Sequence, residues 1–295
     1  MTLPTFVCIG TYKCGTTWLF DMIEQHPDLF VPDFKELHYF SSIHGDGLWA
    51  NKDLDWYEQV FEPGKDKTAR GDISPGYLVE PEVAGRIQAH VSDAKLVCVF
   101  RDPADRVRTH YYYQQNGKVD LGYNFEDLVN NPNVDKSGRW NILNHGMYAR
   151  NLRPFLDKFG KDRFHFILMD DIRDRPHETL RRFFEFVGVD PGFEPDGLGE
   201  RSNAARNLRS RKLYWAKYYA ARFLNRSGLD PVRRAIKATG VPDWLNRLNT
   251  KEVKNPPFAP EHRAKLIEYY RQDILELQDI IDRDLSIWLD PNKLE

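Results

Sequence analysis

A buried strand that runs into a glycine loop and then a helix is the feature that most constrains this chain of 295 residues. Residues 6–9 (FVCI) are apolar throughout, and the lack of polar alternation is typical of a strand covered on both faces of a parallel sheet. Gly10 and Gly15 bound the turn that follows, and a helical segment begins at Thr16. The N–H groups at such a helix start have no intrahelical partner, so the junction favours an anion in the loop.

Strand-like and helix-like segments alternate along the first 190 residues. Short apolar runs at 96–100 and 164–168 predict two further buried strands, and helix-length segments separate them. This order predicts an α/β protein with a P-loop-like parallel sheet flanked by helices and a helical C-terminal extension. We expect one domain over 1–295, with a nucleotide-binding core at 1–190 and a mostly helical part at 191–295. The predicted helices are 16–26, 81–90, 105–115, 147–159, 178–187, 213–224 and 260–285.

The termini and the cysteines predict a cytoplasmic protein. No window approaches the 18 uninterrupted apolar residues of a membrane-spanning helix, and the N-terminus lacks the pattern of a secretion signal. Cys8, Cys14 and Cys98 form no Cys-x-x-Cys pair, and an odd number of cysteines fits a reducing compartment. We expect no integral membrane segment, and we expect Cys14 to fill space in the loop.

The charge balance argues against a nucleic-acid-binding protein. Lys and Arg number 42 against 44 Asp and Glu, which gives a net charge of -2. Residues 201–250, however, contain twelve Lys or Arg and two acids. Such a basic stretch is either a solvated helix face or a surface for an anionic partner.

The loop after the first strand is not a Walker A sequence. That motif ends in Gly-Lys-Ser/Thr, whereas here Lys13 precedes Gly15 by two residues. From spacing alone, a phosphate site and a plain strand-turn-helix junction with a solvated Lys13 are both open.

Two motifs resemble those of sulfotransferases that use 3'-phosphoadenylyl sulfate (PAPS). The loop Lys13-Cys14-Gly15-Thr16-Thr17-Trp18 is similar to the family's 5'-phosphosulfate loop. Arg101-Asp102-Pro103, followed eight residues later by Thr109, is similar to its 3'-phosphate motif. The resemblance implies that Arg101 and Thr109 bind the 3'-phosphate. It implies a donor-binding role for Lys13, Gly15, Thr16, Thr17 and Trp18, although Trp18 is equally a candidate core residue.

The resemblance covers most of the chain. Residues 144–159, 164–171, 181–189 and 284–289 resemble the family's later elements. The chain resembles a bacterial-type member that is closer to the glycan (heparan sulfate) branch than to the cytosolic phenol branch. The implied reaction moves a sulfuryl group to an acceptor hydroxyl or amine and releases 3',5'-diphosphoadenosine, with no metal.

A candidate base follows the first helix. Lys35-Glu36-Leu37-His38-Tyr39-Phe40 resembles the Lys-Glu-x-His-x-Phe stretch of the glycan branch, in which the Glu is the catalytic base. Carried over, Glu36 accepts the acceptor's proton, a role that suits a carboxylate whose pKa burial raises toward neutrality. The resemblance gives Lys13 the role of stabilising the leaving group's charge. The alternatives are a Glu36 that only caps a turn, or His38 or His110 as the base.

The chain departs from the family after the predicted base. Where the glycan branch has Lys-Ser-Pro and the cytosolic branch Lys-Thr-His, this chain has Ile73-Ser74-Pro75, so the Lys of that position is missing. Arg70 lies nearby in sequence. Arg209 and Arg211, in the basic stretch, are candidate ligands of the 3'-phosphate or part of a solvated face.

Two other functions remain open from the sequence. One is a P-loop nucleotide-dependent kinase, and the other is a non-enzymatic polyanion-binding protein built on residues 201–250. The acceptor is equally open among a saccharide, a glycolipid and a secondary metabolite. The aromatic residues that are candidates to line its site are Tyr39, Tyr77, Tyr111, Tyr112, Tyr113 and Trp140.

Overall fold

The computed structural model describes residues 1–33, 35–43, 52–117, 119–135, 141–198, 206–208, 236, 239, 241, 250–252 and 255–293. The chain divides into two compact units. The first comprises 1–111, 123–202 and 258–295, and the second comprises 112–122 and 203–257. In the second unit, β6 (Arg206–Leu208) and β7 (Thr250–Glu252) form an antiparallel pair.

The first unit is built on a five-stranded parallel sheet in the order β2-β3-β1-β4-β5. β1 occupies the centre, where Phe6 aligns with Gly71 of β3 and with Lys95 of β4. Every residue of β1 is buried, as its apolar run predicts. The strands are β1 (Phe6–Gly10), β2 (Leu29–Phe30), β3 (Ala69–Ile73), β4 (Lys95–Phe100) and β5 (Phe164–Leu168).

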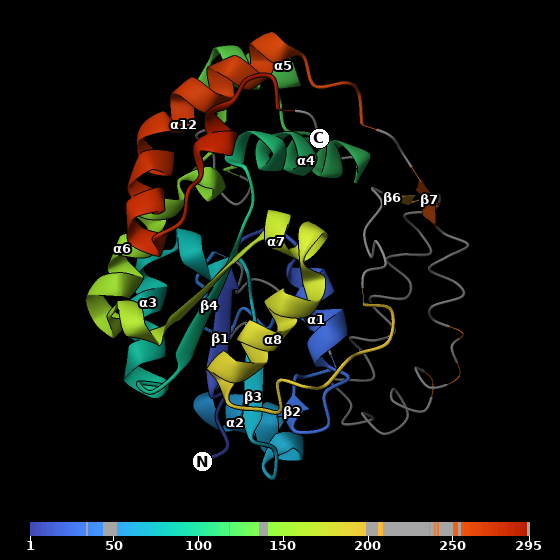
Figure 1. Ribbon diagram of the computed structural model, residues 1–295, viewed down its shortest axis with the longest axis vertical. Helices are drawn as coiled ribbons and strands as arrows, with labels where there is room; N and C mark the ends of the chain where they lie inside the picture. Colours follow the sequence, from blue (N-terminus) through green and yellow to red (C-terminus); the bar gives the residue numbers. More distant parts are fainter. Residues whose placement is uncertain are drawn as a thin grey trace. The chain divides into compact units, whose positions relative to one another are not determined.

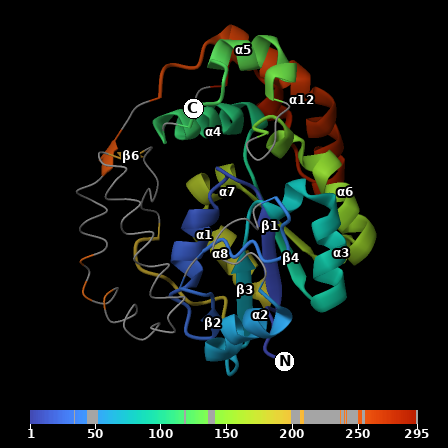
Figure 2. The same ribbon diagram turned by 180° about the vertical axis from the view of Figure 1, so that it is seen from behind.

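Helices cover both faces of this sheet. In Figures 1 and 2, α1 and α8 lie against one face, and α3 and α6 lie against the other. The predicted fold class is therefore confirmed. The helices are α1 (Thr16–Ile23), α2 (Leu54–Phe61), α3 (Pro81–His90), α4 (Pro103–Asn116), α5 (Phe125–Asn130), α6 (Tyr148–Phe159), α7 (Met169–Asp174), α8 (Pro176–Val187) and α12 (Pro260–Ile281).

The predicted C-terminal helical extension is present as α12, which packs on α6. The helix is shorter than the predicted 260–285, because Asp282 takes a left-handed conformation (φ 53°) and ends it. Its Asp273 accepts hydrogen bonds from the N–H groups of Ala149 and Arg150, at 3.0 and 2.9 Å, and so caps the start of α6. The predicted helix 213–224 lies outside the described residues.

Strand β3 has no apolar signal in the sequence, because it carries Arg70, Gly71 and Asp72. Tertiary contacts account for each. The Arg70 guanidinium donates to the carbonyls of Leu3 and Lys67. A Cβ at Gly71 would lie 2.1 Å from the Phe6 ring. The strand therefore forms because its neighbours satisfy residues that have low strand propensity.

Within the described part of the chain, none of the helices has the length and apolar character that crossing a bilayer requires.

Candidate active site

The loop after β1 has a backbone that only certain residues adopt easily. Gly15 is left-handed (φ 101°) and precedes the first turn of α1. A Cβ there would lie 2.9 Å from Met169 Sδ and 3.0 Å from Ile172 Cδ1, so α7 also requires a glycine. Lys13 is left-handed as well (φ 67°). A non-glycine residue in this region costs conformational free energy, which is a frequent property of functional loops.

The loop holds a lysine whose charge is perturbed. Burial lowers the pKa of Lys13 to about 7, against the opposing effect of the nearby Glu36 carboxylate and with a further lowering by Lys35. An ammonium that is partly desolvated gains more from a bound anion than a fully hydrated one.

The other residues of the loop and of the start of α1 differ in exposure: some lie in the core and one lies at the surface. Cys14 is fully buried and burial raises the pKa of its thiol, which suits a space-filling residue and not a nucleophile. Trp18 is 4% exposed, so its ring lies in the core. Thr16 is buried and Thr17 is exposed on the first turn of α1.

The segment of the predicted base lies beside β3. The N–H of Glu36 donates to the Ile73 carbonyl at 3.0 Å, and the N–H of His38 donates to Ser74 Oγ at 3.0 Å. Glu36 (φ 68°) and His38 (φ 49°) are both left-handed. Among the described residues, three of the four non-glycine residues with positive φ therefore belong to this site, since Lys13 is the third.

Glu36 is half-buried and lies near two lysines and a histidine. Its Oε1 lies 3.8 Å from Lys35 Nζ, and its Oε2 lies 3.5 Å from His38 Nε2. Burial alone would raise the pKa of the carboxyl. The hydrogen bond from His38 and the charges of Lys35 and Lys13 outweigh burial, so the pKa is lowered. The condition that burial raises the pKa of Glu36 toward neutrality is therefore not met in this structure.

A buried hydrogen-bond network supports His38. Tyr12 OH lies 3.0 Å from His38 Nε2. Ser74, which accepts from the His38 N–H, donates in turn to Asp72 Oδ1 at 2.7 Å.

Asp72, at the end of β3, anchors that network. Tyr57 and Tyr77 donate to its other oxygen, at 2.9 and 3.0 Å. Sequence reasoning noted this stretch only as a departure from the family. The signal it missed is the pair of polar residues, Asp72 and Ser74, flanking the end of a strand.

The second motif follows β4. Arg101 is partly exposed, and its carbonyl accepts a hydrogen bond from Tyr148 OH at 2.8 Å. Asp102 caps α4 through the Ala104 N–H at 3.0 Å. Thr109, in the second turn of α4, donates to the Asp105 carbonyl at 2.8 Å and keeps oxygen lone pairs available.

A buried charge cluster fixes the turn of the second motif. Arg263 of α12 donates to Asp102 at 2.5 Å and to Asp105 at 2.7 Å. Lys293 lies 3.3 Å from Asp102. Sequence analysis did not identify these partners, because they come from the far end of the chain.

The other candidate base is in the core. His110 is 3% exposed, and burial, followed by the charge of Arg106, lowers its pKa well below the usual value. Its Nδ1 lies 3.2 Å from Arg106 Nη1. Since arginine only donates, Nδ1 is the acceptor and the imidazole is neutral.

The remaining candidate residues lie apart from this site or outside the described part of the chain. Arg70 donates to carbonyls at the opposite end of β3 and does not take the place of the missing lysine at position 73. Tyr77 and Tyr111 are buried, whereas Tyr39 is half-buried beside Trp56, with ring centroids 6.1 Å apart. The residues that lie outside the described part are Trp140, Arg209 and Arg211.

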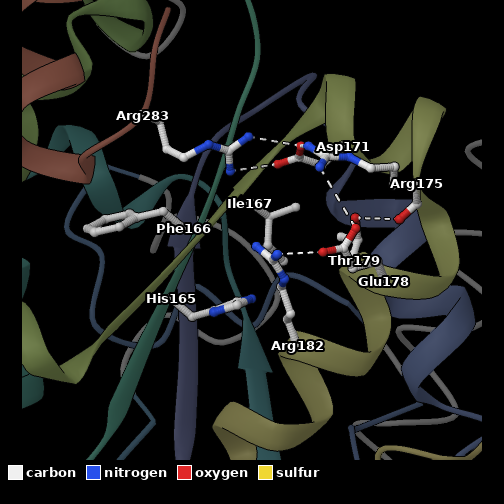
Figure 3. Close-up of a pocket in the computed structure, with 9 residues that line it drawn as sticks. All are labelled: His165, Phe166, Ile167, Asp171, Arg175, Glu178, Thr179, Arg182 and Arg283. Carbon is white, nitrogen blue, oxygen red and sulfur yellow. Dashed lines mark hydrogen bonds and ion pairs between the residues drawn. The ribbon is translucent and has the colours of Figure 1, made fainter.

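A small pocket lies elsewhere, against β5, α7 and α8. Figure 3 shows Arg283 and Arg175 directed at Asp171, and Arg182 directed at Glu178. It encloses about 50 Å³, which is room for one or two water molecules and not a nucleotide. Because its guanidiniums already have carboxylate partners, it is not the candidate active site.

In the described part of the chain, no three His, Cys, Asp or Glu side chains are arranged to hold a metal ion.

Known sulfotransferases are similar to this chain in sequence. The family model of the sulfotransferase domain matches residues 3–274. Heparan sulfate glucosamine 3-O-sulfotransferase 3B1 of Mus musculus is 26% identical over 292 residues, which cover 96% of this chain and 65% of that protein. Membrane-associated sulfotransferase kil1 of Dictyostelium discoideum is 31% identical over 323 residues, covering 97% of this chain and 67% of its own length.

A solved structure supports the fold. The sulfotransferase from Alicyclobacillus acidocaldarius superimposes with a TM-score of 0.72 at 24% identity, covering 98% of this chain and all of that one. The chain spans about two thirds of the length of the two curated relatives. With the family model matching nearly the whole chain, the protein belongs to the sulfotransferase domain family.

Proposed function

We propose that this protein transfers a sulfuryl group from PAPS to a hydroxyl of a saccharide acceptor. The observation that carries the proposal is the placement of Lys13 and Glu36 at the same end of two paired parallel strands: Lys13 follows β1, and the N–H of Glu36 donates to Ile73 at the end of β3. The charge of each side chain shifts the pKa of the other. A cation for the leaving group and a carboxylate for the attacking group are the two charges that an in-line group transfer needs close together.

The residues present fit the donor. PAPS supplies the activated sulfuryl group. Lys13, Gly15 and the first turn of α1, whose start has no side-chain cap, offer an ammonium and free N–H groups to the 5'-side. Arg101 offers a guanidinium to the 3'-phosphate, and the Thr109 hydroxyl, which donates to the Asp105 carbonyl here, would turn its hydrogen to the phosphate when the donor binds. As charge develops on the departing nucleotide, Lys13 stabilises it more in the transition state than in the ground state.

Glu36 is the proposed base. Its lowered pKa keeps the carboxylate ionised at neutral pH and ready to accept the acceptor's proton. His38 holds Oε2 at 3.5 Å, and the Ser74–Asp72 network fixes the backbone of His38. A carboxylate of low pKa is a weaker base. When a bound donor offsets the charges of the nearby lysines, the pKa of Glu36 would rise.

A saccharide is the proposed acceptor. The name of the mouse relative states a heparan sulfate glucosamine acceptor for that protein. In this chain Tyr39 and Trp56, both half-buried, present neighbouring aromatic rings after Glu36. Aromatic faces of this kind pack well against the apolar faces of sugar rings.

Two measurements test the proposal. Titration calorimetry should show binding of 3',5'-diphosphoadenosine, and Arg101→Met should weaken it by about 10- to 100-fold, the value of a charge-assisted contact. Mass spectrometry should detect sulfated product from PAPS and a panel of glycan acceptors. Absence of nucleotide binding, together with absence of transfer to every acceptor, would contradict the proposal.

A further inference from the structure

Lys35 contacts the start of α1, and its ion pair with Glu36 does not account for these contacts. Its Nζ donates to Thr16 Oγ1 at 3.0 Å and to Thr17 Oγ1 at 2.9 Å. Both contacts are shorter than the 3.8 Å that separates Nζ from the Glu36 carboxylate. The ammonium therefore belongs to the first turn of α1 as much as to the predicted base.

This contact orients both hydroxyls. An ammonium only donates, so each threonine oxygen accepts from Lys35 and each O–H hydrogen is directed elsewhere. Thr17 is exposed, and its hydroxyl hydrogen can meet a ligand. The Thr17 hydroxyl, polarised as a donor beside an ammonium, forms with it a site for an anion.

The repulsion between Lys35 and Lys13 makes an anion favourable. Burial lowers the pKa of Lys35, while Glu36, Cys8 and Asp21 act in the opposite direction. Lys35 also lowers the pKa of Lys13, which shows that the two ammonium groups repel each other across the loop. A dianion bound between them would replace this repulsion with two attractions.

We propose that Lys35 is a second cationic ligand of the donor's 5'-phosphosulfate, in the place that Ile73 leaves without a charge. The inference rests on the proposed function. It assigns the 5'-side of the donor to two lysines on different segments, with Lys13 from the loop after β1 and Lys35 from the segment beside the end of β3. A donor bound there offsets the charge of Lys35. That charge then lowers the pKa of Glu36 less, and the carboxylate becomes a stronger base.

The test compares two nucleotides. Lys35→Met should weaken binding of 3',5'-diphosphoadenosine by about 10- to 100-fold, whereas binding of adenosine 3'-monophosphate, which has no 5'-phosphate, should be unchanged. Lys35→Gln, which keeps hydrogen-bond donors and removes the charge, should resemble Lys35→Met. Unchanged binding of the 3'-monophosphate also shows that the variants are folded.

Lys67→Met is the matched control. Lys67 donates to the Pro27 carbonyl near the other end of β3, so its removal deletes the same charge without touching the loop and should leave both affinities unchanged.

A pH profile tests the electrostatic contact between Lys35 and Glu36. Since Lys35 lowers the pKa of Glu36, the acidic limb of kcat/KM should move to higher pH in Lys35→Met. Equal affinity for 3',5'-diphosphoadenosine in wild type and both variants, or full rescue by Lys35→Gln, would overturn the role of Lys35 and leave the proposed function standing. Failure of the wild-type protein to bind that nucleotide would instead overturn the proposed function.

Discussion

Two groups of charges follow the carboxyl ends of the strands, and they are built differently. Arg263 meets Asp102 and Asp105 at 2.5 and 2.7 Å, with all three side chains buried. Around Glu36, by contrast, Lys35 and His38 stay at 3.8 and 3.5 Å, and the carboxylate is 37% exposed.

The backbone differs in the same sense. Asp105 lies within a regular helix, whereas Lys13, Glu36 and His38 all have positive φ. Short buried pairs hold α12 against the start of α4. Longer contacts on a strained backbone leave charges able to respond to a ligand, which distinguishes a structural cluster from a reactive one.

The largest expected effect comes from a substitution in the cluster around Glu36. Glu36→Gln should lower turnover by about 10²- to 10⁴-fold, because the acceptor's proton loses its base. Binding of 3',5'-diphosphoadenosine should be preserved. Steady-state assays with PAPS give the first quantity and calorimetry the second. Glu185→Gln, which removes a surface partner of Arg181, is the control, and near-normal turnover of Glu36→Gln would assign the base elsewhere.

The next largest effect comes from a substitution in the buried cluster of Arg263, Asp102 and Asp105. Arg263→Met should lower the free energy of unfolding by about 3–5 kcal/mol, because it leaves two buried carboxylates without their guanidinium partner. Urea denaturation measures the change. Arg271→Met removes an exposed pair with Glu268 on the same helix and should change stability little. A loss from Arg263→Met no larger than that of the control would refute the assignment.

The smallest expected effect is a pH dependence of nucleotide binding that comes from Lys13. With a pKa of about 7, Lys13 is charged below pH 7 and neutral above it. The affinity for 3',5'-diphosphoadenosine should therefore fall with rising pH, by at most about tenfold per unit between pH 7 and 9, where the nucleotide's phosphates no longer titrate. Calorimetry on Lys13→Arg, whose guanidinium stays charged, should show a flatter profile. A flat wild-type profile would exclude Lys13 as the titrating ligand.

The sequence predicts the parts of this fold that depend on local pattern. The apolar runs identify β1, β4 and β5 as strands; β1 and β4 are buried on both faces, whereas the edge strand β5 is half-exposed at His165 and Phe166. Strand β3 was not predicted, because Asp72 is acceptable in a core only with three hydroxyl donors, one from Tyr57 of α2 and two from Ser74 and Tyr77 in the turn that follows the strand.

The same distinction holds for the site. The motifs identify Lys13, Glu36 and Arg101 by order along the chain. The lowered pKa of Glu36 does not follow from the sequence, because burial is suggested by sequence whereas the positions of the His38 side chain and of two ammonium groups are not.

One buried tyrosine joins the two nucleotide motifs. Tyr148 OH donates to the carbonyl of Arg101 at 2.8 Å and lies 3.6 Å from Cys14 Sγ in the other loop. A single rigid ring thus sets the distance between the two loops that are proposed to hold the donor's phosphates. Discrimination between nucleotides whose phosphates are differently spaced would then depend on a residue that touches neither phosphate.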